Sequence, residues 1–311
     1  MASIVCTLFE NHYHYGVAAL INSLYTNNYR GEVYVGYRGS LPNWAEKAPS
    51  FQTGVKTLSW AEGLDVHFLL IQTSYHFANY KPYFIRELLL GPAAQATSIF
   101  YFDPDILVNC RWAFFEEWAS CGVALVHEII RHDMGPQHPF RVAWERTAEK
   151  INLFPRRLLH SYINAGFCGV NRNNIEFIDI WIKVIEAIVK QHNTDPTCFT
   201  SFDRSYPFNF VDQDAMNIAA MCCESPVSEM GPEAMDFVPG GWTMSHATGF
   251  PKPWRKNFLL SAFQGVPPTR ADKAYWAYVE EPVCLYKSYD IVRKRIALRI
   301  ASFISRFYRR N

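Results

Sequence analysis

The sequence has few charged residues and almost no net charge. Lys and Arg number 30 against 29 Asp and Glu in 311 residues, so the formal net charge is +1 and charged residues make up only 19% of the chain. Such a balance excludes the broad basic surface that attracts nucleic acid, and we expect no nucleic-acid partner. With 49% hydrophobic residues the chain is also not disordered, and we expect a globular protein with a substantial core.

The sequence also lacks paired cysteines and long apolar runs. Its eight cysteines include no Cys-x-x-Cys pair, and several lie in apolar segments, so we expect buried free thiols and no disulfide framework or zinc site. The N-terminus has no basic region, and its apolar run stops at Glu10, too early for a signal peptide or a membrane span. Because no other stretch could cross a bilayer, a cytoplasmic protein is expected.

Hydrophobic periodicity predicts short buried strands that alternate with helices, the pattern of an α/β fold with a mostly parallel central sheet. The expected strands cover 4–9, 32–37, 55–58, 98–102, 122–127 and 161–170, and the expected helices cover 13–25, 74–90, 175–189, 210–221 and a segment from 274 onward. Pro82 should lie in the first turn of its helix or kink it. The polar segment 129–160 fits an insertion packed over the sheet, and the Gly- and Pro-rich segment 231–268 is expected to be irregular.

Two carboxylates, Asp103 and Asp105, follow the apolar strand at 98–102. Ligands gather at the carboxyl ends of strands in such sheets. Carboxylates two residues apart can turn toward one hard cation, which then binds diphosphate oxygens. Taken alone, the pair fits a solvated turn equally well.

The most specific pattern is H-x-x-G-x-x-K-P-W, which starts at His246. An imidazole can complete a metal site that carboxylates begin. Gly249 permits close backbone approach, and Lys252 supplies a point charge suited to a phosphate. The alternative is a Pro-rich surface loop with an incidental histidine.

Polar residues in two further segments favour contacts with a sugar. Asn164 enters an apolar strand, where sugar hydroxyls would satisfy its amide donor and acceptor together, although a turn-forming Asn is the alternative. Asp212 and Gln213 lie at the start of a helix, where Asp212 could instead be the N-cap.

These four patterns, in this order, resemble glycosyltransferase family 8, which includes glycogenin and bacterial lipopolysaccharide galactosyl- and glucosyltransferases. The resemblance covers about residues 3–256. It implies a GT-A catalytic domain over 1–270. The segment 129–160 matches no pattern of the family and is expected to be an acceptor-side insertion, and residues 274–311 are expected to form a C-terminal helical tail. It also implies a retaining hexosyltransferase that uses a UDP-sugar donor, Mn²⁺ or Mg²⁺, and a glycan or glycolipid acceptor such as a lipopolysaccharide intermediate.

Matched by position, the resemblance makes Asp103, Asp105 and His246 the metal ligands. It places Asp212 at the sugar hydroxyls and Gln213 beside the reacting carbon, and these two are the expected catalytic residues. Thr7, Leu8 and Asn11 match the positions where the family holds the uracil ring and ribose of the donor, and Asp103 would also approach the ribose. The positions matched to the donor's sugar or diphosphate are Lys81, Asn164, Gly249 and Lys252. Many members have an acidic residue soon after the first strand, whereas this chain has Phe9 to His14 there.

Two other functions stay open. A sugar-nucleotide nucleotidyltransferase would share much of the fold, but it usually carries a Gly-rich loop with a basic residue after the first strand, which residues 9–15 lack. A catalytically inactive family member could act as a binding or scaffold subunit, although the intact Asp103, Asp105, His246 and Lys252 argue against it. Donor hydrolysis would separate an active enzyme from a scaffold.

The C-terminal segment concentrates basic charge. Between Lys287 and Arg310 there are eight Lys or Arg and one acid, Asp290. On a helical wheel one side carries Ile296, Ile300, Phe303, Ile304 and Phe307, and the adjoining side carries Arg295, Arg299, Arg306 and Arg310. A basic amphipathic helix of this kind favours peripheral docking on the anionic inner face of a membrane. The alternative is that the apolar side packs on the catalytic domain.

Overall fold

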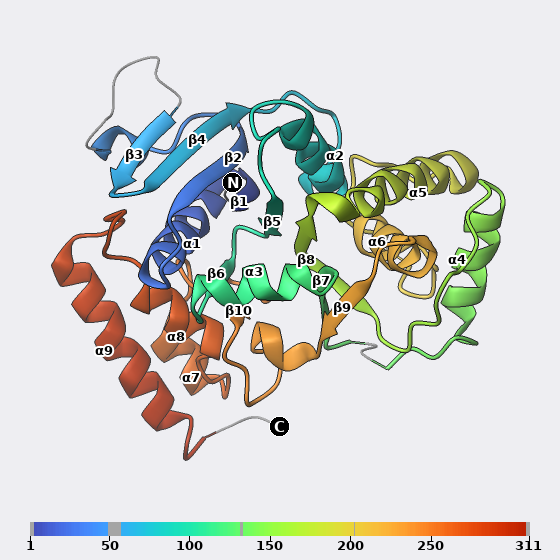
Figure 1. Cartoon of the computed structure of the whole chain (residues 1–311). Coiled ribbons are helices and arrows are strands. Elements are labelled where there is room, and N and C mark those ends of the chain that lie inside the picture. Colours follow the sequence, from blue (N-terminus) through green and yellow to red (C-terminus); the bar gives the residue numbers. More distant parts are fainter. Residues whose placement is uncertain (1–2, 49–56, 131–132, 202, 309–311) are drawn as a thin grey trace.

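The computed structural model describes residues 3–48, 57–130, 133–201 and 203–308 (Figure 1). Within these ranges, eight strands form one sheet in the order β3-β4-β2-β1-β5-β8-β7-β9, and β10 and β6 form a second, two-stranded sheet. The strands are β1 (Ser3–Glu10), β2 (Gly31–Arg38), β3 (Thr57–Ala61), β4 (Leu64–Leu70), β5 (Ser98–Phe102), β6 (Ile106–Val108), β7 (Val123–His127), β8 (Ile163–Asn171), β9 (Val227–Met230) and β10 (Met244–His246). The helices are α1 (His14–Thr26), α2 (Phe77–Leu90), α3 (Trp112–Ser120), α4 (Pro139–Glu149), α5 (Glu176–His192), α6 (Val211–Cys222), α7 (Phe258–Phe263), α8 (Arg270–Ala277) and α9 (Ser288–Ile304).

The central sheet is mostly parallel, which confirms the expected α/β class. β4, β2, β1 and β5 run parallel to one another, and so do β7 and β9. β8 is antiparallel to both of its neighbours, β5 and β7. The first residues of β8 therefore lie at the same edge of the sheet as the carboxyl ends of β5 and β7, where ligands gather in α/β folds.

Helices cover both faces of this sheet, because the central strands carry apolar side chains on both of their faces. In β1, Ile4, Cys6 and Leu8 pack with residues of α2, α5 and α6, whereas Val5 and Phe9 pack with residues of α1 and α3. α3 lies in front of the sheet in Figure 1, with α5 and α6 to its right. The sheet is thus held between two helical layers.

The predicted strands at 4–9, 32–37, 98–102, 122–127 and 161–170 correspond to β1, β2, β5, β7 and β8. The prediction at 55–58 is met only at its end by β3, and Val55 lies outside the described residues. β4 was not predicted. The helix α2 begins at Phe77, three residues later than predicted, and Pro82 lies in its interior and not in its first turn. All eight cysteines are free, as expected, but only five of them are buried: Cys121, Cys198 and Cys284 are exposed, contrary to the expectation.

The C-terminal part contains two helices where one was expected. α8 ends at Ala277 and α9 begins at Ser288. Together with α7 they bury a third apolar cluster, which also includes Ala19 from α1 and Leu107 from β6. The segment 231–268, expected to be irregular, contributes β10 and α7. Among the described residues, no helix has the length and apolar character needed to cross a membrane.

Candidate metal and donor site

Asp103 and Asp105 lie in the tight connection between β5 and β6. The amide N–H of Asp103 donates to the carbonyl of Gly166 on β8 (2.7 Å), and the carbonyl of Asp103 accepts from Ile106 N–H (3.0 Å). α1 packs closely on this connection: a Cβ on Gly16 would lie 2.0 Å from the carbonyl oxygen of Pro104. Glycine at position 16 is therefore required for α1 to support the turn that presents both carboxylates.

His246 completes a group of three metal-ligating side chains. β10 pairs with β6 so that His246 is opposite Ile106, and the ligand atoms of Asp103, Asp105 and His246 lie within 4.8 Å of one another. His246 Nε2 is 3.3 Å from Asp105 Oδ1. A Cβ on Gly166 would lie 2.5 Å from His246 Cε1, so the backbone of β8 also leaves room for the imidazole.

The three side chains fit a divalent cation. Nδ1 of His246 is buried and has no hydrogen-bond partner among the described residues, and a buried nitrogen of this kind is an available ligand. Carboxylates and an imidazole are common ligands of divalent cations.

Lys252 neutralises Asp105. Its Nζ lies 2.6 Å from Asp105 Oδ2 and also donates to the carbonyl of Ala247 (2.6 Å). Both partners are buried. Burial by itself would raise the pKa of Asp105, but His246 and Lys252 outweigh it and hold this pKa well below its ordinary value.

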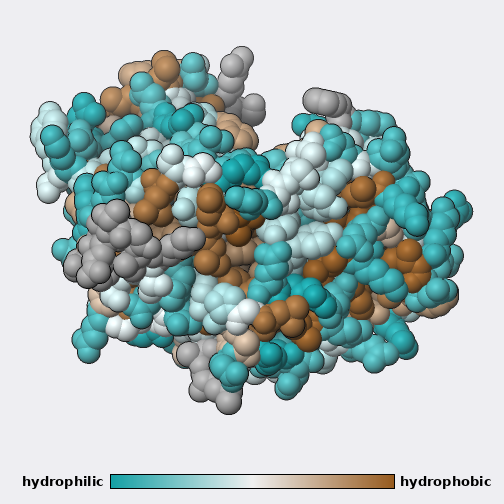
Figure 2. All heavy atoms as spheres, turned by 90° about the horizontal axis from the view of Figure 1, so that it is seen from above, coloured by the Kyte–Doolittle hydropathy of each residue, from teal (hydrophilic) through white to brown (hydrophobic). Residues whose placement is uncertain are grey.

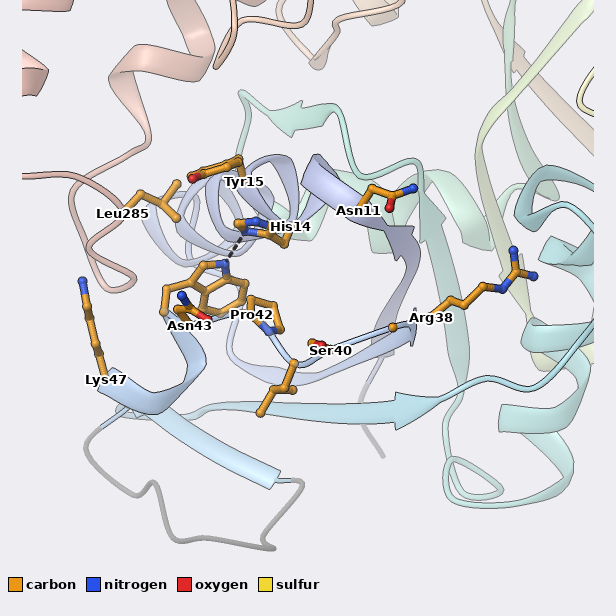
Figure 3. Close-up of a pocket in the computed structure, with 12 residues that line it drawn as sticks. Asn11, His14, Tyr15, Arg38, Ser40, Pro42, Asn43, Lys47 and Leu285 are labelled. Atoms are coloured by element: carbon orange, nitrogen blue, oxygen red, sulfur yellow. Dashed lines mark hydrogen bonds between the residues drawn. The ribbon is translucent and has the colours of Figure 1, made fainter.

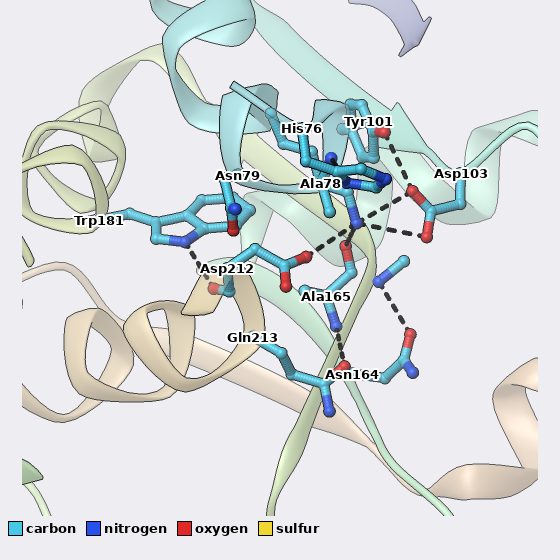
Figure 4. Close-up of polar contacts among 12 residues, drawn as sticks. His76, Ala78, Asn79, Tyr101, Asp103, Asn164, Ala165, Trp181, Asp212 and Gln213 are labelled. Atoms are coloured by element: carbon cyan, nitrogen blue, oxygen red, sulfur yellow. Dashed lines mark hydrogen bonds and ion pairs between the residues drawn. The ribbon is translucent and has the colours of Figure 1, made fainter. Parts of the chain in front are cut away.

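Lys81 joins Asp103 of the metal-ligating group to Asp212 of α6, and these two carboxylates are labelled in Figure 4. Its buried Nζ lies 3.0 Å from Asp103 Oδ1 and 3.1 Å from Asp212 Oδ2, and it donates to the carbonyl of Ala165 (3.0 Å). Burial lowers the pKa of Lys81, but the two carboxylates raise it above its ordinary value overall. The pKa of Asp103 is raised, because burial outweighs the effect of Lys81.

Asp212 is not the N-cap of α6, so that alternative is wrong. The N-cap is Phe210, and the side chain of Asp212 points to Lys81 while its backbone carbonyl accepts from Trp181 Nε1 (2.8 Å). The next residue, Gln213, turns its Oε1 to the amide N–H of Ala165 (3.1 Å). The first turn of α6 thus presents two polar side chains to the beginning of β8.

Asn164 lies inside β8, so the alternative of a turn-forming Asn is also wrong. Its Oδ1 accepts from Gly166 N–H (2.8 Å), and its Nδ2 donates to Glu128 Oε2 (2.6 Å). Sequence reasoning missed Glu128. It directly follows the apolar strand β7, and the rule that drew attention to Asp103 would have found it.

The three residues expected at the nucleoside are not equivalent. Thr7 and Leu8 are buried within β1, with 0% and 2% of their surface exposed. Asn11 is exposed in a left-handed conformation (φ 54°) and lines a cavity of about 400 Å³ (Figure 3). No described atom lies within 4 Å of a Cβ built on Gly249, so packing within the protein does not require a glycine there.

A second polar contact supports the loop that carries Lys252. Trp254 Nε1 donates to Nδ1 of His12 (2.9 Å), just beyond β1.

The space-filling view from above shows a notch between two lobes, with apolar side chains gathered near the middle of this face (Figure 2).

No protein-family model matches the sequence, and neither does any curated protein sequence. The fold, in contrast, matches solved structures of glycosyltransferases. The bifunctional glycosyltransferase WbbM matches with a TM-score of 0.55 and 14% identity over 94% of this chain and 51% of its own. The glycosyltransferase GlyE of Streptococcus pneumoniae matches with a TM-score of 0.51 and 14% identity over 96% of this chain and 64% of its own. This chain thus spans about half of WbbM and less than two thirds of GlyE.

The galactosyltransferase LgtC, solved in complex with donor and acceptor sugar analogs, matches over nearly its whole length. The TM-score is 0.50, with 14% identity over 94% of this chain and 99% of LgtC. At such low identity these likenesses establish the fold, and the chain has the GT-A fold of glycosyltransferases. The narrower resemblance to glycosyltransferase family 8 stays a prediction.

Proposed function

We propose that this protein is a metal-dependent, retaining glycosyltransferase that moves a hexose from a UDP-sugar to a hydroxyl of a glycan or glycolipid. The observation that carries the proposal is the Asp103–Asp105–His246 group, whose ligand atoms lie within 4.8 Å of one another at the carboxyl edge of a GT-A sheet. Two buried lysines lie directly beside it. Such a site suits a cation and the diphosphate of a donor together. In this proposal residues 1–270 are the catalytic domain and 274–311 the tail.

Asp103, Asp105 and His246 would hold Mn²⁺ or Mg²⁺. When bound, the cation supplies positive charge that stabilises the departing nucleoside diphosphate. Lys252 is placed to add a second positive charge on the same side, since its ammonium is already held beside Asp105. Its pairing with the diphosphate would strengthen as negative charge develops on the leaving oxygen.

Asp212, Gln213, Asn164 and Glu128 would surround the hexose. The ion pair with Lys81 makes Asp212 a poor nucleophile, because the carboxylate charge is already balanced. Asp212 is therefore better suited to stabilising a cationic sugar than to attacking it. We favour a front-face route, in which the departing phosphate oxygen accepts the proton of the acceptor hydroxyl and configuration is retained.

The test is donor hydrolysis in the presence of Mn²⁺ with UDP-glucose, UDP-galactose and UDP-N-acetylglucosamine. We expect slow release of one free sugar, its loss in excess chelator, and its loss in Asp105→Asn. An inactive scaffold would release no sugar from any donor, and a nucleotidyltransferase would instead form a UDP-sugar from UTP and a sugar 1-phosphate. With an acceptor, product of inverted configuration by NMR would refute retention.

The tail supports a second part of the proposal, peripheral docking on an anionic membrane. α9 packs on α7 and α8 with Ile291, Leu298 and Ala301, so the buried side of the helix is not the predicted apolar stripe. Most of that stripe is exposed instead: Ile296 (49%), Ile300 (46%), Phe303 (59%) and Phe307 (78%). Ile304 is half-buried, Arg295 pairs with Glu280, and Arg310 lies outside the described residues.

An exposed apolar stripe flanked by Arg299 and Arg306 suits an anionic bilayer surface. The test is Phe303→Asp, because removing α9 would uncover the apolar cluster that it buries. We expect several-fold weaker sedimentation with phosphatidylglycerol vesicles and unchanged donor hydrolysis. Leu90→Asp is the matched control, since Leu90 is similarly exposed (64%) at the end of α2. Equal vesicle binding by both variants would show that the stripe does not dock.

A further inference from the structure

The chain around Lys252 is packed on its C-terminal side and open on its N-terminal side. Residues 248–251 are exposed. Lys252, Trp254 and Lys256, in contrast, are buried. The position of the Lys252 ammonium therefore depends on how residues 252–256, the lysine segment, are fixed to the rest of the protein.

Two helices of the C-terminal part hold the backbone of the lysine segment. Trp276 of α8 donates from Nε1 to the carbonyl of Pro253 (3.2 Å). Lys294 of α9 donates from Nζ to the carbonyl of Lys256 (3.0 Å). Figure 1 shows α9 running alongside α8 and α7, with which it packs. Hydrogen bonds from distant parts of the chain thus hold the segment near both of its ends.

Arg295, the next residue of α9, ties α8 to the same helix. Its Nε donates to the carbonyl of Trp276 (2.8 Å), and its Nη2 pairs with Glu280 (2.7 Å). The carbonyl of Trp276 belongs to the last turn of α8, where backbone oxygens need partners from outside the helix. The guanidinium thereby fixes the end of α8 from which the indole of Trp276 reaches the lysine segment.

Lys294 lies in surroundings where an apolar side chain would cost less. Its Nζ lies 5.6 Å from the centre of the Phe258 ring and 5.8 Å from that of Trp276. Burial and the neighbouring Arg293 lower the pKa of Lys294, and among the described residues no carboxylate pairs with it. A partly buried ammonium needs a hydrogen-bond acceptor, and the carbonyl of Lys256 provides one. The ammonium is therefore tied to the backbone of the lysine segment.

We infer that Lys294 and Trp276 are positioning residues for Lys252. By holding the backbone of the lysine segment, they keep the Lys252 ammonium beside Asp105. The inference rests on the proposed function, in which Lys252 pairs with the diphosphate of the donor. It gives the tail a part in the donor site in addition to the docking surface on the outer side of α9.

Loosening the lysine segment should change two affinities in opposite directions. The Lys252 ammonium competes with a cation for Asp105, so a less firmly held Lys252 should let Mn²⁺ bind more tightly when no phosphate is present. Pyrophosphate should bind more weakly to the Mn²⁺-loaded protein, because the ammonium that meets it is less well placed. A general loss of stability would not raise one affinity while it lowers the other.

The experiment measures by calorimetry the binding of Mn²⁺ alone and of pyrophosphate in saturating Mn²⁺, with the full chain. Lys294→Met and Trp276→Phe each remove one hydrogen bond. We expect each to bind Mn²⁺ about two- to tenfold more tightly and pyrophosphate about two- to tenfold more weakly, the range for a single hydrogen bond. In a Lys252→Met background neither substitution should change either affinity further, because both act through Lys252.

Two control variants separate positioning from other effects. Arg293→Met removes an exposed basic residue next to Lys294 on α9, where it faces Asp290 (3.6 Å), and both affinities should stay unchanged. Lys256→Met breaks the buried side-chain ion pair with Asp272 but keeps both carbonyl bonds, so it should lower the Tm and leave the two affinities unchanged.

The outcomes distinguish this inference from the proposed function. If Lys294→Met and Trp276→Phe bind Mn²⁺ and pyrophosphate as the wild type does, the tail does not position Lys252, and the proposed function stands. The inference is also overturned if a control variant shows the same pair of changes, or if the changes persist in the Lys252→Met background. If the wild type binds neither Mn²⁺ nor UDP, the proposed function itself fails.

Discussion

Replacing Lys252 by Met should tighten the binding of Mn²⁺ when no nucleotide is present. The ammonium of Lys252 lies 2.6 Å from Asp105 Oδ2, so a cation that uses Asp105 has to compete with it. A hydrogen bond to a charged group contributes about 1.5–3 kcal/mol, and each 1.4 kcal/mol corresponds to a factor of ten. Releasing Asp105 from this contact should therefore lower the Kd for Mn²⁺ by about ten- to hundredfold.

The same substitution should lower the stability of the apo protein and its affinity for UDP. Met cannot neutralise the buried carboxylate of Asp105, and breaking a buried ion pair costs about 3–5 kcal/mol. Mn²⁺ would restore the missing charge, so we expect it to raise the Tm of the variant more than that of the wild type. UDP should bind more weakly, since Lys252 no longer pairs with the diphosphate.

The assays are Mn²⁺ titration by calorimetry or by EPR of the free ion, and thermal unfolding with and without Mn²⁺. Lys256→Met is the matched control, because Lys256 is a buried lysine whose Nζ lies 2.7 Å from Asp272 Oδ2, away from the metal-ligating group. The control should lose stability and bind Mn²⁺ as the wild type does. If Lys252→Met binds Mn²⁺ no more tightly than this control, the reasoning about competition for Asp105 is wrong.

Three further changes test other parts of the site. Gly166→Ala should weaken Mn²⁺ binding at least tenfold, because the new Cβ would lie 2.5 Å from His246 Cε1. Gly249→Ala should leave Mn²⁺ binding unchanged in the same titration, because no described atom lies within 4 Å of its new Cβ. Asp212→Asn should lower kcat by about 10²–10³ with little change in the Kd for UDP, and an equal loss of UDP binding would contradict its place at the sugar. Burial would raise the pKa of Glu229, but hydrogen bonds with His127 and Ser161 lower this pKa overall. The stability that the Glu229 carboxylate adds is therefore fully present above its ordinary pKa of about 4.3, and it is lost as the pH falls through its pKa in the folded protein. The Tm difference between wild type and Glu229→Gln should therefore shrink below about pH 4, and a difference that grows toward acid would refute the lowered pKa of Glu229.

Sequence patterns predicted β1, β2, β5, β7 and β8 of the central sheet because their apolar runs are short and bounded by polar residues, but they missed β4 and β9. They could not predict how residue 246 approaches residue 105. That approach depends on the pairing of β10 with β6, two three-residue strands in segments that show no hydrophobic periodicity. Asn164 and Asp212 were each compatible with a local role, as a turn residue or a helix cap. Their places inside α6 and β8 exclude those roles, and their contacts with Lys81 and Glu128 come from distant parts of the chain.

The balance of buried charge explains why these residues should act together. Two lysines, Lys81 and Lys252, form ion pairs with three carboxylates, those of Asp103, Asp105 and Asp212. One negative charge is left over if His246 is neutral. A divalent cation alone would change this to one positive charge, and a nucleoside diphosphate alone would add at least two negative charges. Either imbalance is costly in a site shielded from water. Cation and diphosphate together leave the net charge close to its starting value, so each should favour the binding of the other. Because binding free energies are linked, the factor by which UDP tightens Mn²⁺ has to equal the factor by which Mn²⁺ tightens UDP. In Lys252→Met both factors should fall, since the protein then accepts the cation without help from the nucleotide.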